Sequence, residues 1–232
     1  MLPKAFTGPS GRTLTHWDLK LWCELETNGS FGWNPTEIEF NSGFKCHIYL
    51  RGRNDLSDNT WLLSKTANSL DGIVDALPYR YGKQQCYIGI PTAGTQLATA
   101  LAFERRGLIG HETPCFRSMR TELKKHGKDN MWIDPPDLSR HTYISIENVM
   151  STAGSMITAF ERMESDGYPT MYMDHVVFAD WELGGLTNLH KKGYEKIHVR
   201  YVIRDIIAAF VHIGRWPKER WDYIEPKLAV FR

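Results

Sequence analysis

An α/β fold built on a parallel sheet is the architecture that this sequence predicts. Short apolar runs at residues 87–90, 142–146, 175–179 and 196–202 alternate with segments of helical periodicity. Because parallel strands need crossover connections, usually helices, this alternation indicates right-handed β–α–β units. In such a fold, ligands bind along the edge formed by the carboxyl ends of the strands.

The N-terminal part predicts a small cap on that core, which we call the hood. Thr15 or Thr13 begins a helix whose apolar residues recur at four-residue spacing and which ends near Asn28. Residues 38–40 and 46–50 alternate like two strands around an Asn-Ser-Gly turn. The hood is therefore expected to combine a helix with a hairpin.

The rest of the chain is expected to form a single domain with this hood. A second helix is predicted from Asn59 to about Ala76. No internal repeat or long charged linker divides the chain. We expect the hood to cover about residues 1–58, the α/β core about 59–212, and a tail that docks on its own domain about 213–232.

Composition excludes several classes of protein. The 232 residues are 42% hydrophobic with a net charge of +1, so no global field favours nucleic acid as a partner. No apolar run approaches the roughly 20 residues that span a bilayer, and the N-terminus lacks the apolar core of a signal peptide. The four cysteines lie far apart and the histidines show no zinc-ligand spacing. We expect a soluble, cytoplasmic protein without membrane contact and without a metal site of its own.

Residues 144–155 carry the strongest functional signal. An apolar run reaches Glu147 and Asn148, and a hydroxyl-rich turn then leads into a helix. Free amides at a helix start, with small residues beside them, bind anions. The candidate anion-binding residues are Ser151, Thr152, Ala153, Gly154 and Ser155. Glu147 can accept hydrogen bonds from sugar hydroxyls, so a sugar phosphate suits the loop, although an ordinary strand-to-helix turn fits the same pattern.

Two further segments point to a second anionic group. Residues 91–95 follow another predicted strand and lead into a helix, as the first loop does. Residues 117–130 contain two arginines, three lysines and a histidine. They predict a mobile cationic lid over a ligand with two phosphate ends, or alternatively a solvated face.

Taken in chain order, these motifs resemble the type I phosphoribosyltransferases, and within them the orotate type. The resemblance spans about residues 22–210. It implies a Rossmann-like phosphoribosyltransferase core, phosphoribosyl pyrophosphate as donor and a pyrimidine base as acceptor, in nucleotide biosynthesis. It also implies Mg²⁺ bound through the donor, and a homodimer in which the lid is shared across the interface.

The resemblance also implies roles for individual residues. The 5-phosphate would bind Ser151 to Ser155, and Glu147 and Asn148 would hold the ribose hydroxyls. Residues placed near the pyrophosphate are Thr92, Ala93, Gly94, Thr95 and Arg120. Lys124 and His126 of the lid would close over the leaving group as catalytic residues. Phe40, Lys45 and Trp181 would lie near the base.

Four positions depart from the family pattern. Asn148 replaces the second of two adjacent acids, and Ala93 and Thr121 stand where the family has lysines. Trp181 occupies the place of an arginine that pairs with the orotate carboxylate. Arg117, Lys125 and Lys128 are candidates to replace the missing cations.

Three hypotheses follow from these departures. The first is a working orotate-type phosphoribosyltransferase with altered contacts. The second is a phosphoribosyltransferase for another base, on which Trp181 stacks. The third is a regulatory protein that binds phosphoribosyl pyrophosphate but has lost efficient chemistry. Turnover with any base would exclude the third.

Overall fold

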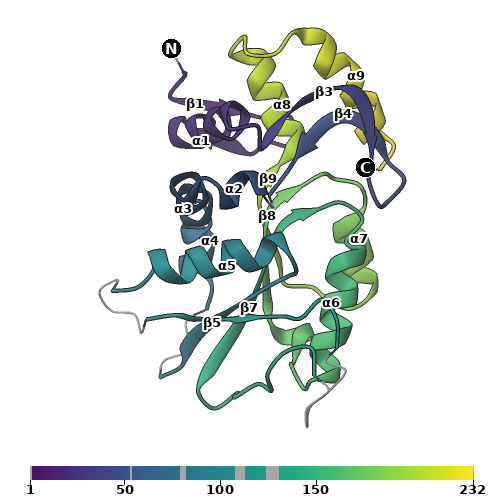
Figure 1. The fold of residues 1–232 in the computed structure, drawn as a ribbon. Helices are drawn as coiled ribbons and strands as arrows, with labels where there is room; N and C mark the ends of the chain where they lie inside the picture. The colour runs from purple at the N-terminus through teal and green to yellow at the C-terminus, as the bar shows by residue number, and fades with distance from the viewer. Residues whose placement is uncertain (1, 53, 79–81, 108–112, 124–130, 232) are drawn as a thin grey trace.

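A five-stranded parallel sheet forms the core of the molecule (Figure 1). The computed structural model describes residues 2–52, 54–78, 82–107, 113–123 and 131–231. In spatial order the strands are β6 (Cys115–Ser118), β5 (Gln84–Gly89), β7 (His141–Met150), β8 (Asp174–Asp180) and β9 (Ile197–Val202). The predicted parallel sheet is confirmed. The edge strand β6 was not predicted, because its four residues contain a single large apolar side chain.

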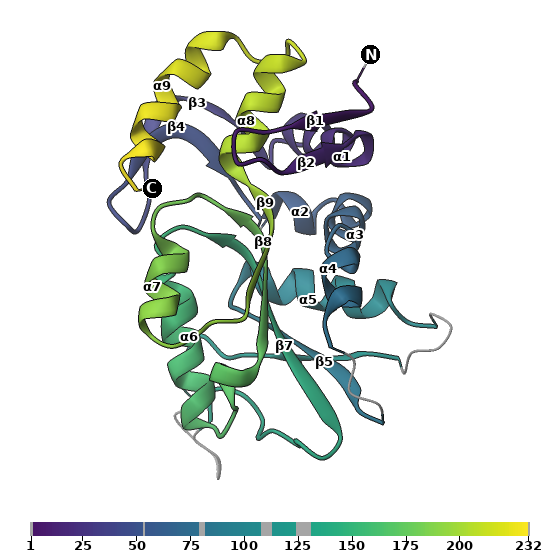
Figure 2. The same ribbon diagram turned by 180° about the vertical axis from the view of Figure 1, so that it is seen from behind.

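Helices cover both faces of this sheet (Figures 1 and 2). One face carries α3 (Thr60–Asn68), α4 (Asp71–Ala76) and α5 (Ala93–Glu104), and the other carries α6 (Gly154–Ser165) and α7 (Gly185–Lys191). Neighbouring strand residues enter different apolar clusters: Tyr87 belongs to the cluster that contains Leu97 of α5, whereas Cys86 and Ile88 belong to the one that contains Phe160 of α6. This alternation is the two-residue period of a strand buried on both faces.

The expected helix over residues 59–76 was wrong in one respect: it is two helices. The break falls at Ser69 and Leu70, where the Ser69 hydroxyl donates to the Thr66 carbonyl. A serine bonded to the preceding turn offers an alternative to the helical hydrogen bonds, which is consistent with a break at this point. Arg105, whose side chain is almost buried, then fixes α4 through ion pairs with Asp71 and Asp75.

The hood is built from both ends of the chain. Its strands are β3 (Phe31–Glu39) and β4 (Lys45–Leu50), beside α1 (His16–Thr27), α2 (Asn54–Ser57), and a hairpin of β1 (Ala5–Thr7) and β2 (Thr13–Thr15). The last two helices, α8 (Ile203–His212) and α9 (Lys218–Ala229), pack beside it (Figure 1). In the core, a short 3₁₀ turn, Thr170–Tyr172, precedes β8. Of the two predicted caps, Thr15 is the one that caps α1, and it forms a capping box with Asp18.

The C-terminal tail docks on the hood through aromatic and charged contacts. Trp216 stacks on Phe31 with ring centroids 5.1 Å apart. Lys227 of α9 pairs with Glu37 of β3 at 2.6 Å. The expectation that this tail docks on its own domain is confirmed. Within the described ranges, no helix has the length and apolar character needed to cross a membrane.

Candidate active site

The 151–155 loop joins β7 to α6 at the carboxyl edge of the sheet. Ala153 adopts a left-handed conformation with φ 63°, which turns the chain into the helix, and no side chain caps α6. Ser151 and Thr152 are half-buried, whereas Gly154 and Ser155 are exposed. The first amides of α6 therefore remain uncapped by any side chain, which is the arrangement that receives an anion.

Helix α7 supports this loop from behind. Asn188 donates its side-chain amide to the Thr152 carbonyl at 3.0 Å. Gly185 lies so close to the Ser151 carbonyl that a side chain there would collide with it. The backbone N–H of Trp181 donates to the Met150 carbonyl at 2.9 Å. The loop is thus held from two sides in a fixed shape.

Glu147 and Asn148 lie just before this loop, near the end of β7. Glu147 is 5% exposed, and its Oε1 accepts a hydrogen bond from the Asn148 backbone N–H at 2.8 Å. The Asn148 side chain lies directly against Gly52, at the end of the hood hairpin, and Gly52 also adjoins Ala93. Asn148 and Ala93, two of the departures from the family pattern, therefore face the same glycine.

The 91–95 loop packs against the strand that carries Glu147. The Ile90 N–H donates to the Ile146 carbonyl at 2.9 Å, and Gly94 lies in such close contact with that carbonyl that no side chain would fit. The Pro91–Thr92 peptide bond is cis. The two loops that were predicted to bind anions are brought together at the carboxyl ends of adjacent strands.

A cavity of about 570 Å³ opens between the 91–95 loop and the segment after β6. The residues that line it are Pro91, Thr92, Thr95, Gln96, Met119, Arg120, Thr121 and Glu122. Arg120 is anchored there by donating to the Met131 carbonyl at 2.6 Å. Lys124 and His126, which we predicted to be catalytic, lie outside the described residues, as do Lys125 and Lys128.

Arg117 does not supply a cation to this cavity. Its guanidinium donates to the Asp134 and Pro135 carbonyls and to the Tyr168 hydroxyl, and it covers the Tyr143 ring. The hypothesis that Arg117 replaces a missing lysine is therefore not supported by its placement. In the described part of the chain, no group of three or more His, Cys, Asp or Glu side chains is arranged to hold a metal ion.

The predicted base-binding residues come from the hood and from the end of β8. Trp181 is only 1% exposed, and Phe40 packs edge-on against it with ring centroids 4.9 Å apart. Trp181 therefore offers no open face to a ligand in this conformation. Lys45 is exposed and pairs with Glu39 at 3.1 Å.

A cavity of about 490 Å³ lies between the hairpin tip of the hood and the 151–155 loop. Its lining includes Ser42, Gly43, Phe44 and Lys45 of the hood, Thr152, Leu183, and Lys227, Val230 and Phe231 of the tail. The tail residues were missed from sequence, because nothing in the pattern of α9 shows that it ends above this loop. Lys227 is held by Glu37, the Tyr223 hydroxyl and the Lys45 carbonyl.

Asp180, at the end of β8, is a buried acid that the sequence did not single out. Burial raises its pKa from the ordinary 3.8 to about 7, against the opposing effect of a hydrogen bond from the Glu182 N–H. It lines a cavity of about 360 Å³ beside the start of α7, where Arg204 forms a two-bond ion pair with Glu182. A carboxyl with such a pKa exchanges a proton near neutral pH.

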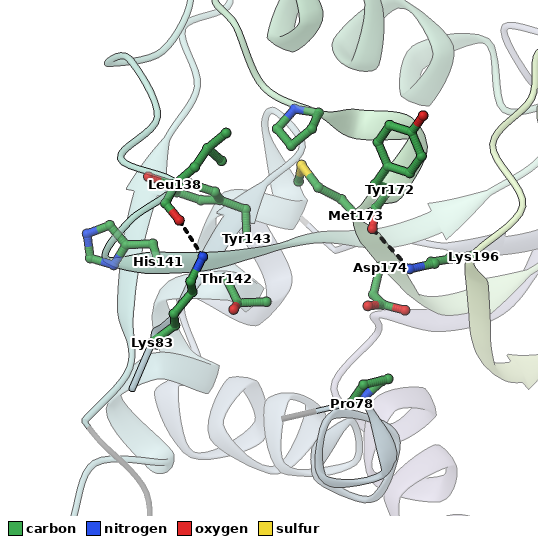
Figure 3. Close-up of a pocket in the computed structure, with 11 residues that line it drawn as sticks. Pro78, Lys83, Leu138, His141, Thr142, Tyr143, Tyr172, Met173, Asp174 and Lys196 are labelled. Atoms are coloured by element: carbon green, nitrogen blue, oxygen red, sulfur yellow. Dashed lines mark hydrogen bonds between the residues drawn. The ribbon is translucent and has the colours of Figure 1, made fainter. Parts of the chain in front are cut away.

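A separate cavity of about 360 Å³ lies at the opposite, amino-terminal edge of the sheet (Figure 3). Its lysines are already engaged: Lys83 donates to the Leu138 carbonyl and Lys196 to the Tyr172 carbonyl. None of the predicted site residues lines it. In an open α/β sheet ligands bind at the carboxyl edge, so we place the candidate site at the two loops.

Sequence comparison finds similar proteins at low identity. The chain is 24% identical over 199 residues to the orotate phosphoribosyltransferase of Cytophaga hutchinsonii, covering 80% of this chain and 88% of that protein. It is 27% identical over 144 residues to the orotate phosphoribosyltransferase of Staphylococcus epidermidis, covering 62% of this chain and 61% of that protein. No family model matches the chain.

Structural comparison identifies the same fold. The Leishmania donovani UMP synthase structure superposes with a TM-score of 0.70 at 18% identity, over 91% of this chain and 42% of that one. The chain thus spans less than half of that protein. The orotate phosphoribosyltransferase of Francisella tularensis gives a TM-score of 0.60 at 11% identity, over 89% and 98% of the two chains. The chain therefore has the phosphoribosyltransferase fold and resembles the type I phosphoribosyltransferases, most of all the orotate type.

Proposed function

We propose that this protein is an orotate-type phosphoribosyltransferase, which transfers ribose 5-phosphate from phosphoribosyl pyrophosphate to a pyrimidine base and releases pyrophosphate. One observation carries the proposal. The 151–155 loop and the 91–95 loop meet on either side of Glu147, at the carboxyl ends of β7 and β5. A ligand with one phosphate, a ribose and a pyrophosphate has the order of groups that this arrangement can receive.

The residues match the charge that this reaction develops. Breaking the bond between ribose carbon 1 and pyrophosphate leaves positive charge on the sugar and negative charge on the leaving group. The Glu147 carboxylate would face the sugar, the amides of α6 would hold the 5-phosphate, and Arg120 would face the pyrophosphate. Holding both ends of the donor fixes carbon 1 opposite the base.

Mg²⁺ would depend mainly on the donor for its ligands. It commonly binds through substrate phosphates and one or two carboxylates, and keeps several waters. Glu147 is the carboxylate next to both loops, while the described residues offer no cluster of acids that would hold the ion alone. When bound, the ion would neutralise charge on the departing pyrophosphate.

Lys45 supports an anionic base as the acceptor. It lines the cavity between the hood and the 151–155 loop, and its ion pair with Glu39 is exposed to solvent, so this pair contributes little and can be exchanged for another anion. Lys227 is committed to three partners. An ammonium group can attract the orotate carboxylate without the two-bond geometry of an arginine.

A second candidate function is transfer to another base. The observation that favours it is Trp181, which stands where an orotate-binding arginine is expected and is buried beneath Phe40. Position 181 therefore supplies no cation for a carboxylate, and a carboxylate buried there would lose hydration without gaining a partner, so a base without a carboxylate suits the site.

Pyrophosphate release from phosphoribosyl pyrophosphate and Mg²⁺ tests the proposal, with orotate and other pyrimidine and purine bases offered one at a time. Release with orotate is the expected result. Release with another base alone would replace the first candidate by the second. If no base supports release but the donor still raises the melting temperature, the protein binds the donor without turning it over.

We also propose a cytoplasmic homodimer that shares the lid containing Lys124 and His126 between subunits. A lid supplied by the partner would make each site dependent on two chains. Mixing a lid variant, Lys124→Ala, with a chain inactivated at Glu147 should then restore part of the activity. Light scattering on the purified protein reports the oligomeric state directly.

A further inference from the structure

Two cysteines face each other across neighbouring strands, away from the proposed active site. Cys86 of β5 and Cys115 of β6 are register partners in the parallel sheet. Neighbouring strands lie about 4.8 Å apart, within the roughly 4.4–6.8 Å between Cα atoms that a disulfide needs. Register partners also point to the same face, so the pair needs no change of strand register to be bridged.

The two thiols differ in access to solvent. Cys86 is 0% exposed, whereas Cys115 is half-buried on the edge strand of the sheet. A small oxidant can therefore reach Cys115 first. Cys23 and Cys46 are both buried elsewhere, and burial raises the pKa of each.

The surroundings of Cys115 favour its thiolate. Its Sγ lies 3.8 Å from Nδ1 of His141, and Arg117 and Arg140 add positive charge nearby. A hydrogen bond with Cys86 is the main cause that lowers the pKa of Cys115 to about 7, and the same bond raises the pKa of Cys86. Figure 3 shows His141 at the start of β7, with its ring pointing away from Asp174 and Lys196.

We propose that Cys86 and Cys115 are a peroxide-sensitive dithiol that closes into a disulfide between β5 and β6. The Cys115 thiolate attacks one oxygen of hydrogen peroxide, the O–O bond breaks, and the hydroxide that leaves is protonated to water. Cys115 is then a sulfenic acid. Cys86 attacks its sulfur, the S–S bond forms, the S–O bond breaks, and the hydroxide leaves as water with the Cys86 proton. Two thiols lose two electrons, and one peroxide becomes two waters.

The location gives this bond a structural consequence. The chain runs from β5 into the 91–95 loop and from β6 into the segment containing Arg120, which form the two walls of the 570 Å³ cavity. A disulfide would fix these strands to each other at their amino-terminal side. The proposal itself does not rest on the proposed function, because it concerns thiols outside the two loops.

Mass spectrometry of the full chain tests the proposal. The folded, reduced protein is treated with hydrogen peroxide in the presence of a metal chelator, unfolded in an alkylating reagent and digested. The expected product is one intramolecular disulfide joining the peptides of Cys86 and Cys115, with Cys23 and Cys46 alkylated. Four alkylated cysteines, a different pairing, a bond between two chains, or direct conversion of Cys115 to sulfinic acid would each overturn the proposal.

Variants separate the two steps. Cys86→Ser should leave a sulfenic acid on Cys115 that dimedone captures, while Cys115→Ser should keep Cys86 reduced at the same peroxide concentration. Cys46→Ala is the matched control and should form the same disulfide as the wild-type chain. Circular dichroism confirms that each variant is folded before oxidation. Dimedone capture at Cys86 in the Cys115→Ser variant would reverse the assigned order and overturn it.

Discussion

The 151–155 loop and the 91–95 loop occupy equivalent places at the ends of neighbouring strands, but they are equipped differently. The first keeps its hydroxyls and is braced by Asn188 and Gly185 of α7. The second fits closely against the Ile146 carbonyl, yet carries Ala93 where the family has a lysine. Both loops lead from the end of a strand into a helix, but the 91–95 loop lacks the positive charge that a lysine at position 93 would supply.

This difference separates binding of the donor from its chemistry. On the proposed function, a 5-phosphate on the first loop would be held mainly by backbone amides, which no side-chain substitution removes. The pyrophosphate at the second loop would need positive charge that acts most strongly in the transition state. We therefore expect the donor to bind well and to react slowly for this family.

The largest expected effect is that of Glu147→Gln, which removes charge beside the ribose and keeps the side-chain volume. Turnover should fall about 100-fold or more, because a preorganised charge contact of this kind is worth that much. Donor affinity, measured by calorimetry, should change by less than about threefold, since the phosphate contacts stay.

Glu161→Gln is the matched control for that variant. Glu161 is exposed and pairs with Lys192 on the surface, so its loss should leave turnover unchanged. If Glu147→Gln retains wild-type turnover, Glu147 does not act on the sugar. The proposed position of the ribose between the two loops would then be wrong.

Adding a negative charge next to Glu147 tests the same comparison by a gain of activity rather than a loss. Asn148→Asp recreates the adjacent pair of acids and should raise turnover about 10-fold, since one added charge contact to the transition state is worth about 1.4 kcal/mol. Initial rates of pyrophosphate release measure the gain. Asn148→Ala should not produce it, because it removes the amide without adding charge, and an equal gain in both variants would show that crowding against Gly52 limits the wild-type enzyme.

The core of the fold could be predicted because its signals are local. Strands β7 and β8 contain short apolar runs, β9 is rich in β-branched residues, and a threonine, Thr15 or Thr13, marks the start of α1. Edge strand β6 escaped detection because its stability comes from pairing with β5 rather than from its own four residues. At the break after Asn68 the Ser69 hydroxyl donates to the Thr66 carbonyl, a contact that composition does not display.

The site was predictable only where sequence neighbours stay neighbours in space. The loop hydroxyls and Glu147 belong to one segment, so their grouping followed from the chain itself. Lys227 and Phe231 reach the cavity beside Thr152 from the far end of the chain, and Trp181 is covered by Phe40 from the hood. Such long-range contacts leave no periodic signal. The roles assigned to the loop residues, to Glu147, and to Lys124 and His126 all stay predictions.

A smaller effect tests the contact by which Asn188 of α7 supports the 151–155 loop. Asn188→Ala removes the hydrogen bond to the Thr152 carbonyl and should weaken donor binding by about fivefold, since one such bond contributes roughly 1 kcal/mol. Turnover at saturating donor should stay near that of the wild type. Asn34→Ala, which removes an exposed amide in the hood, is the control. A fall in turnover with unchanged affinity would mean that α7 serves the chemistry rather than the anchor.

The smallest effect concerns the contribution of Asp180, at the end of β8, to the stability of the fold. The raised pKa of Asp180 means that the folded state favours the neutral acid: its contribution to stability is complete below the unfolded value near 3.8 and is lost as pH rises through about 7. Asp180→Asn removes the buried charge and keeps an acceptor for the Glu182 N–H. The melting temperature should therefore rise at pH 8, by about 2–4 °C for each kcal/mol gained, and should rise less at pH 5, where the folded-state carboxyl is still protonated. An equal rise at both pH values would assign the gain to packing, whereas a fall at pH 8 would show that the ionised carboxylate helps to hold the end of β8 beside the 151–155 loop.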